Sequence, residues 1–344
     1  MALPAKYAFS IGPIRPPSEG GSASLLLQVT RNCHWNRCGF CRLYRGARFE
    51  LREPAEVIAE IDRIAALCRD LQACAQHHGH GGRIDREAAL EFLEHEPELR
   101  ASHEFLLVYQ WLLAGARTAF LQDANTLIMP AAGLAAILTH LRATFPSLQR
   151  VTSYARAKTL CQKKPADLAR VRAAGLDRLH VGLESGDDEV LTRVDKGVTG
   201  AGHIRAGQQA RTAGFQLSEY WMPGLGGREL SAQHVGNTAR VLNAIDPDYI
   251  RTRPYMELPG TELQAAAQRG EFTPLGPREQ LVEIREMVAA LEVTGRVCFD
   301  HCANDWPGPE GGLLLRQDYE GYRFPDEKGA LLARIDASLR QQAA

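Results

Sequence analysis

Short apolar runs rich in β-branched residues alternate with longer stretches along most of the chain, from Ser24 to about Asp300. The short runs have the length of strands, and the longer ones space their apolar residues three or four apart, as on one face of a helix. This alternation predicts βα units around a parallel sheet. The expected strands are residues 24–30, 117–121, 150–154, 177–183, 215–222, 248–253 and 296–300.

The stretches between these strands predict helices, several of which begin with a proline in the first turn. The expected helices are residues 54–73, 130–144, 165–174, 200–213, 231–244 and 277–293. Six such crossovers favour an α/β fold, a partial or full (β/α) barrel of about six parallel strands. We expect an N-terminal extension over 1–23, a barrel domain over 24–300 with a helical insertion at about 76–115, and a C-terminal extension over 301–344.

Composition narrows the classes of protein that this chain can represent. Its 344 residues are 45% hydrophobic and 24% charged, with a formal net charge of −1. These values predict an ordinary globular core and exclude a disulfide-stapled miniature scaffold. Near-neutral charge argues against duplex nucleic acid or an anionic membrane as the main partner. The first 17 residues lack an apolar leader core, and the apolar run 129–138 is too short to span a bilayer, so we expect a soluble, cytoplasmic protein.

Three of the eight cysteines lie in one short segment directly after the first expected strand. Cys33, Cys38 and Cys41 have the spacing C-x4-C-x2-C, which lets one loop surround a single metal centre. Arginine and asparagine residues flank them, so the segment does not have the composition of a buried core. The pattern therefore predicts a metal site.

The spacing leaves three kinds of metal centre open. A structural zinc site needs a fourth protein ligand, for which His34 or a distant cysteine is available. A plant-type [2Fe-2S] centre uses the same spacing with a further cysteine, and Cys68 or Cys74 lies at a suitable distance. Cys68, however, falls on the apolar stripe of a long predicted helix, which favours core packing. The third option is a [4Fe-4S] cluster held by three thiolates, which leaves one iron open to chemistry.

The cysteine segment resembles that of the radical S-adenosylmethionine (radical SAM) enzymes, which place a three-cysteine loop after the first strand of a barrel. Phe40 stands before the third cysteine, as an aromatic residue does in that family. The first gap is four residues here, where the family usually has three. The segment 180–191, His-Val-Gly-Leu-Glu-Ser-Gly-Asp-Asp-Glu-Val-Leu, is similar to the family's ribose-binding turn after the fourth strand. The resemblance covers residues 24 to about 300.

This resemblance implies a fold, a cofactor pair and a reaction. It implies a barrel of the radical SAM type, a [4Fe-4S] cluster on Cys33, Cys38 and Cys41, and S-adenosylmethionine (SAM) cleaved to a 5′-deoxyadenosyl radical that takes hydrogen from a substrate. The alternative is a non-catalytic protein on the same fold that binds or delivers a cluster or haem. A ferredoxin-like carrier would need four cysteine ligands. No nucleic-acid module is appended to the barrel, so nucleic acid is not expected as a partner.

The resemblance also assigns roles at the carboxyl ends of the strands, where active sites of parallel barrels lie. Glu184 is expected to accept the ribose hydroxyls, and Arg156 or Lys196 to pair with the methionyl carboxylate. Gln122 and Asp123 follow the second strand, where the family places acceptors for the methionyl ammonium. The expected cofactor-binding residues are Phe40, Gln122, Asp123, Ser153, Arg156, Glu184, Lys196 and Met222.

The residues expected to meet the substrate lie on the fifth and sixth strands. Alternation puts Tyr249, Arg251 and Arg253 on one face, which should point inward because helices cover the outside. Two inward arginines suggest a small substrate with an anionic group, the alternative being an internal salt-bridge network. Glu219 is expected to line the same cavity. An electron donor such as flavodoxin or ferredoxin is expected to dock on the arginines near the cysteines, Arg31, Arg37, Arg42, Arg45, Arg48 and Arg52.

Two further groups of potential ligands are not expected to form metal sites. Alternation separates Cys298 and Cys302 from His301, so these three residues do not converge. His77, His78 and His80 lie in an exposed glycine-rich loop, which lacks the rigid support that a metal site needs.

Overall fold

The computed structural model describes residues 4–19, 23–308 and 311–342. The chain forms two compact units. Unit 1 comprises Met1–His34, Arg48–Tyr154 and Ala166–Arg178, and unit 2 comprises Trp35–Ala47, Ala155–Pro165 and Leu179–Ala344. The boundaries expected at residues 23 and 300 stay predictions, and residues 1–3, 20–22, 309–310 and 343–344 of the two expected extensions lie outside the described part.

Unit 1 is built on three parallel strands in the order β1-β4-β5. Leu26 of β1 pairs with Phe120 of β4, which pairs in turn with Thr152 of β5. A short antiparallel pair, β2 and β3, follows β1. The strands are β1 (Ser24–Gln28), β2 (Thr30–Arg31), β3 (Glu50–Leu51), β4 (Thr118–Gln122) and β5 (Arg150–Ala155).

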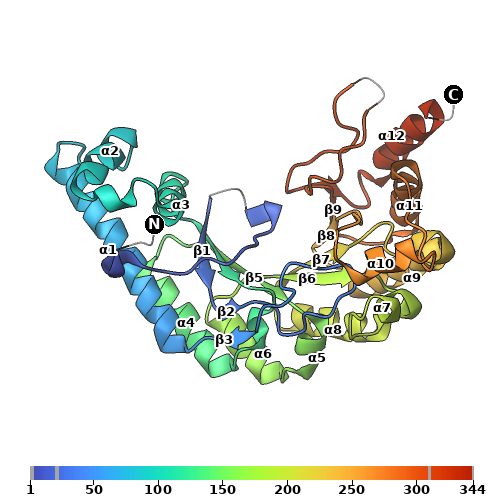
Figure 1. Cartoon of the computed structure of the whole chain (residues 1–344), viewed down its shortest axis with the longest axis horizontal. Coiled ribbons are helices and arrows are strands. Elements are labelled where there is room, and N and C mark those ends of the chain that lie inside the picture. Colours follow the sequence, from blue (N-terminus) through green and yellow to red (C-terminus); the bar gives the residue numbers. More distant parts are fainter. Residues whose placement is uncertain (1–3, 20–22, 309–310, 343–344) are drawn as a thin grey trace. The chain divides into compact units, whose positions relative to one another are not determined.

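The helices of unit 1 include the predicted insertion, which forms α2 and α3. Asp85 caps α2 by accepting from the Ala88 amide, and Ser102 caps α3 by accepting from the Phe105 amide, which supplies partners for exposed helix-end donors. The long helix α1 packs against α2 and α4 (Figure 1). The helices are α1 (Pro54–His77), α2 (Arg86–His95), α3 (His103–Leu113), α4 (Ala131–Thr144) and α6 (Pro165–Ala173).

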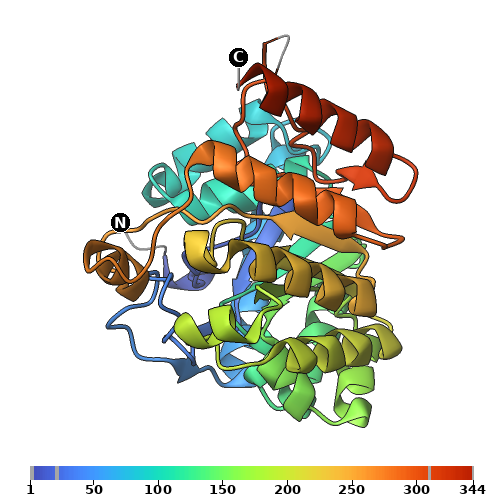
Figure 2. The ribbon, with the colours of Figure 1, turned by 90° about the vertical axis from the view of Figure 1, so that its right-hand side faces the viewer.

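Unit 2 continues the βα pattern with strands in the order β6-β7-β8-β9-β10. β8 runs parallel to β7 and β9, and the short β10 is antiparallel to β9. Helices α8, α9, α11 and α12 pack on one another in chain order (Figure 2). The strands are β6 (Arg178–Glu184), β7 (Gln216–Trp221), β8 (Tyr249–Thr252), β9 (Arg296–Cys298) and β10 (Tyr322–Arg323). The helices are α5 (Ala157–Gln162), α7 (Asp188–Arg193), α8 (Gly200–Thr212), α9 (Gly227–Ile245), α10 (Glu262–Gln268), α11 (Pro277–Ala290) and α12 (Lys328–Gln341).

The predicted α/β class with mostly parallel strands is confirmed, and all seven expected strands are present. Helices α5, α7 and α10 were not predicted, because two turns are too short to show a helical period. Strand β8 ends at Thr252, so Arg253 lies beyond it. Among the described residues, no helix combines the length and hydropathy needed to cross a membrane.

Candidate functional site

The second half of the cysteine segment is anchored to the rest of unit 2 by backbone hydrogen bonds. The Gly39 amide donates to the Val194 carbonyl at 2.8 Å, and the Gly39 carbonyl accepts from the Leu263 amide at 3.0 Å. The indole N–H of Trp35 donates to the Asp195 carbonyl at 2.6 Å. These contacts fix the loop that carries Cys38 and Cys41.

An apolar cluster lies beneath these two thiols. Phe40 and Met222 belong to it, and Cys38 and Cys41 pack against it. Burial raises the pKa of the Cys38 thiol, and the nearby positive charges of Lys196 and Arg156 offset part of that rise. The structure thus brings Phe40 and Met222 together with two of the predicted ligands.

Cys33 belongs to unit 1, where Asp123 holds the start of its loop. The Asp123 carboxylate accepts from the Gln28 side chain and from the Asn32 amide, both at 2.9 Å. Asn32 has φ +66°, a left-handed turn that asparagine tolerates. Asp123 therefore positions the residue next to Cys33, and its expected contact with the methionyl ammonium stays a prediction.

Two other expected cofactor-binding residues of unit 1 make local hydrogen bonds. The Gln122 amide donates to the Gly12 and Ile14 carbonyls at 3.0 and 2.6 Å and accepts from the Gly12 amide at 2.8 Å. The Ser153 hydroxyl donates to the Tyr154 carbonyl at 3.0 Å. Gln122 thus ties the N-terminal segment to β4, and the cofactor roles of both residues stay predictions.

Charged side chains predicted at the ends of different elements meet in unit 2. Lys196 Nζ lies 2.9 Å from Glu184 Oε1, and both side chains are about nine-tenths buried. The Arg156 guanidinium donates to the Lys196 carbonyl. A Cβ on Gly182 would lie 2.2 Å from Glu184 Oε1, so a larger residue at this position would displace the Glu184 carboxylate.

Glu219 on β7 lies in the same electrostatic environment. Its carboxylate is buried, and no hydrogen-bond partner for either oxygen is found in the described part of the chain. Burial raises the pKa of Glu219 well above its usual value, Lys196 opposes the rise and Glu184 adds to it. A carboxyl group kept neutral in this way can donate a proton or a hydrogen bond to a ligand.

Two residues near this group were not predicted as part of the site. His203 on α8 is fully buried, and burial together with Lys196 and Arg156 holds its pKa well below the usual value. Trp35 has the Arg156 guanidinium 4.7 Å from its ring centroid, within the range of a cation–π contact. A Cβ on Gly197 would lie 2.4 Å from the Trp35 ring. Trp35 lies inside the cysteine segment, and this position was the one feature of the sequence that could have identified it as a residue of the site.

Arg251 forms the internal network that the sequence left open as an alternative. Its side chain is 1% exposed and lies 2.6 Å from Asp300, with further bonds to the Ser218 hydroxyl and the Tyr319 carbonyl. Arg253 is exposed beyond the end of β8. Binding of an anionic substrate group by Arg251 or Arg253 stays a prediction.

The expected arginine surface is smaller than predicted. Arg52 is buried and pairs with Glu60 at 2.8 Å, so its inclusion was wrong. Arg37, Arg42 and Arg45 are exposed in unit 2. Near β9, Cys298 is buried, and burial raises its thiol pKa to about 12, which agrees with the expected packing role.

Glu283 on α11 supports the turn after Met222 and gives stability a dependence on pH. It accepts from the Gly224 amide and, at 2.6 Å, from Ser231, and burial raises its pKa to about 7. The unfolded chain loses this proton near 4.5. The folded state therefore loses about 3 kcal/mol of stability as pH rises from about 4.5 to about 7.

Glu283→Gln should remove this pH dependence, because glutamine can accept from Gly224 and donate to Ser231 without ionising. Urea unfolding of both proteins at about pH 5 and about pH 8 measures the difference. If the free energy of unfolding changes equally with pH in the two proteins, Glu283 is not the group that takes up the proton on folding.

Comparison with solved structures assigns the fold. TsrM of Kitasatospora setae is a radical SAM methyltransferase whose structure has cobalamin and a [4Fe-4S] cluster bound. It matches with a TM-score of 0.53 and 15% identity, over 95% of this chain and 62% of that chain. The chain has the fold of the radical SAM enzymes, as the sequence resemblance implied.

Comparison with individual proteins gives weaker similarity. The tRNA uridine(34) acetyltransferase of Methanocaldococcus infernus is 26% identical over 122 residues, which are 35% of this chain and 22% of the acetyltransferase. The structure of archaeal Elp3 from the same organism matches with a TM-score of 0.47 and 15% identity, over 67% of this chain and 57% of that chain. The match with the tRNA uridine(34) acetyltransferase thus spans less than a quarter of that protein's length. No family model matches the chain.

Proposed function

We propose that the chain is a radical SAM enzyme whose Cys33, Cys38 and Cys41 hold a [4Fe-4S] cluster. The observation that carries this proposal is the set of three half-buried cysteines, spaced C-x4-C-x2-C and not in disulfides, in a chain with the radical SAM fold. When bound, the cluster supplies the electron that cleaves SAM to a 5′-deoxyadenosyl radical, which takes hydrogen from the substrate.

The residues around Cys38 and Cys41 suit such a centre. Thiolates are the protein ligands of iron–sulfur clusters, and none of the eight cysteines, all within the described residues, forms a disulfide. The apolar cluster that includes Phe40 and Met222 limits water beside two of the ligands. The positive charges of Lys196 and Arg156 favour the thiolate form of Cys38.

The charged group of unit 2 supports the proposed binding of SAM. Glu184 is proposed to accept the ribose hydroxyls, and Lys196 or Arg156 to pair with the methionyl carboxylate. Lys196 pairs with Glu184 at 2.9 Å, and Arg156, which donates to the Lys196 carbonyl, brings a second positive charge to the same group. Met222 and Phe40 supply an apolar surface for the adenine.

The substrate and partners are proposed only by chemical class. We propose a small organic substrate with an anionic group, near Glu219 and Arg253. The exposed Arg37, Arg42 and Arg45 suit an acidic electron donor such as flavodoxin or ferredoxin. Eight cysteines with no disulfide among them support a reducing, cytoplasmic location.

The proposed cofactor pair can be tested by spectroscopy. Protein reconstituted anaerobically with iron and sulfide should hold about four irons per chain, and its reduced form should give an electron paramagnetic resonance signal that SAM alters. If SAM leaves the signal unchanged, the proposal that one iron of the cluster is open to bind SAM is wrong. Stoichiometric haem binding without any effect of SAM would favour the delivery protein instead.

Lys196→Met tests the role of the charged group. Loss of this ammonium should weaken SAM binding about 10- to 100-fold, the value of a hydrogen bond between charged groups. Equilibrium dialysis of reconstituted, folded protein measures the affinity, with Lys164→Met as the matched control because Lys164 is exposed. Equal affinities of Lys196→Met and the control would exclude Lys196 from SAM binding.

A further inference from the structure

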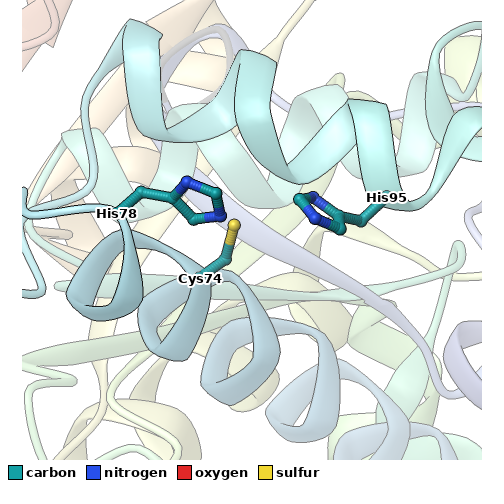
Figure 3. Close-up of side chains that lie close together, drawn as sticks. All are labelled: Cys74, His78 and His95. Atoms are coloured by element: carbon teal, nitrogen blue, oxygen red, sulfur yellow. The ribbon is translucent and has the colours of Figure 1, made fainter.

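A second group of metal-ligating side chains lies in unit 1, among residues that the proposed function does not use. Cys74, His78 and His95 each offer one ligand atom, and these atoms all lie within 4.8 Å of one another (Figure 3). In the described part of the chain, no other set of three or more such side chains meets this distance. We propose that Cys74, His78 and His95 bind a zinc ion.

The three ligands come from the ends of two helices. Cys74 lies in the last turn of α1, and His78 caps that helix, with its amide donating to the Cys74 carbonyl at 3.0 Å. A spacing of four residues places both side chains on one side of the helix. His95 is the last residue of α2, and in Figure 3 all three side chains point toward a common space.

A hydrogen bond holds the His95 imidazole in the form that can bind a metal. Its Nδ1 lies 2.8 Å from the Glu91 carbonyl. Because a carbonyl oxygen only accepts, Nδ1 carries the proton, and the lone pair is left on Nε2. A histidine whose second nitrogen donates to a carbonyl is the usual arrangement around protein-bound zinc. His78 repeats the pattern more loosely, with Nδ1 3.6 Å from the Glu91 carboxylate.

The local charge also suits a cation. The Glu91 carboxylate lies 3.0 Å from His80 Nε2 and faces His78. A divalent ion would replace the thiol proton and would balance the charges of the thiolate and of Glu91.

The ligand types select the metal. A thiolate with two imidazoles suits zinc, whereas magnesium and calcium prefer oxygen ligands. Tetrahedral zinc needs ligand atoms about 3.5 Å apart, and the exposed side chains of His78 and His95 can close that far by rotation. Three protein ligands leave the fourth position for water. The ion would join the end of α1 to the end of α2.

Cobalt titration tests the site in full-length protein without a polyhistidine tag. Co²⁺ replaces zinc in such sites, and a cysteine ligand gives a thiolate-to-cobalt charge-transfer band. Wild type is compared with Cys74→Ala, His95→Ala and the matched control His77→Ala, which removes an exposed neighbouring histidine outside the group. Cys33, Cys38 and Cys41 are present in every variant, so whatever metal they bind cancels in the differences.

We expect wild type and His77→Ala each to bind one more equivalent of cobalt than Cys74→Ala binds. This additional cobalt should give the charge-transfer band. His95→Ala should bind that equivalent more than about 100-fold more weakly. Circular dichroism of the metal-free variants shows that they are folded, and His95 lies at an exposed helix end where alanine is tolerated. Titrations of Cys74→Ala and His95→Ala that superpose on wild type would overturn the proposal. A loss in His77→Ala equal to that in Cys74→Ala would do the same.

Discussion

Cys38→Ala is expected to lose the reconstituted iron–sulfur cluster and, with it, all cleavage of SAM. Three thiolates are the set proposed for the cluster, so the loss of one leaves a second iron without its protein ligand. Cys38 packs against the apolar cluster beside Phe40, and alanine keeps most of that contact. The variant should therefore fold normally while its visible absorbance after reconstitution falls to background.

Cys302→Ala provides the matched control for a lost thiol. Cys302 is exposed and lies outside the cysteine segment, so this variant should keep the cluster and the cleavage of SAM. Cluster content is measured by iron and sulfide analysis together with absorbance. Retention of cluster and cleavage in Cys38→Ala would refute the ligand assignment.

Arg251→Met should destabilise the protein by about 3–5 kcal/mol, because it leaves the Asp300 carboxylate buried without its partner. Arg251 is 1% exposed, and its ion pair with Asp300 has a distance of 2.6 Å. Burial has already raised the pKa of Asp300, with Arg251 opposing the rise. Urea unfolding measures the loss.

The double variant Arg251→Met with Asp300→Leu separates a structural role from substrate binding. Removing both charges should recover most of the lost stability, since an apolar pair of similar volume can replace a buried ion pair. If Arg251→Met is as stable as wild type and loses only affinity for substrate, the guanidinium serves the substrate and not the internal network.

The fold was predictable from sequence because each βα unit shows its own local period. Strands such as β6 and β7 are short segments that begin after one glycine and end before another, and α8 and α9 are long enough to show a helical stripe. Six-residue helices such as α7 lack that signal. The limits of β8 at Thr252 also depend on its pairing with β7, which no local pattern shows.

The site was predictable only as far as neighbours in sequence determine it. Alternation on β8 identified Arg251 as inward-facing, but its partner Asp300 lies 49 residues further along the chain. The Glu184 and Lys196 pair likewise depends on how α7 turns back toward the end of β6. Cys74 and His95 come together because two helices meet, so the sequence did not show that they complete a group of ligands with His78.

Formation of 5′-deoxyadenosine tests the central claim most directly. Anaerobically reconstituted wild-type protein, mixed with SAM and dithionite, is analysed for this product by mass spectrometry. We predict 5′-deoxyadenosine in wild type and none in Cys38→Ala. An intact cluster that yields no 5′-deoxyadenosine from SAM would contradict the proposed enzyme.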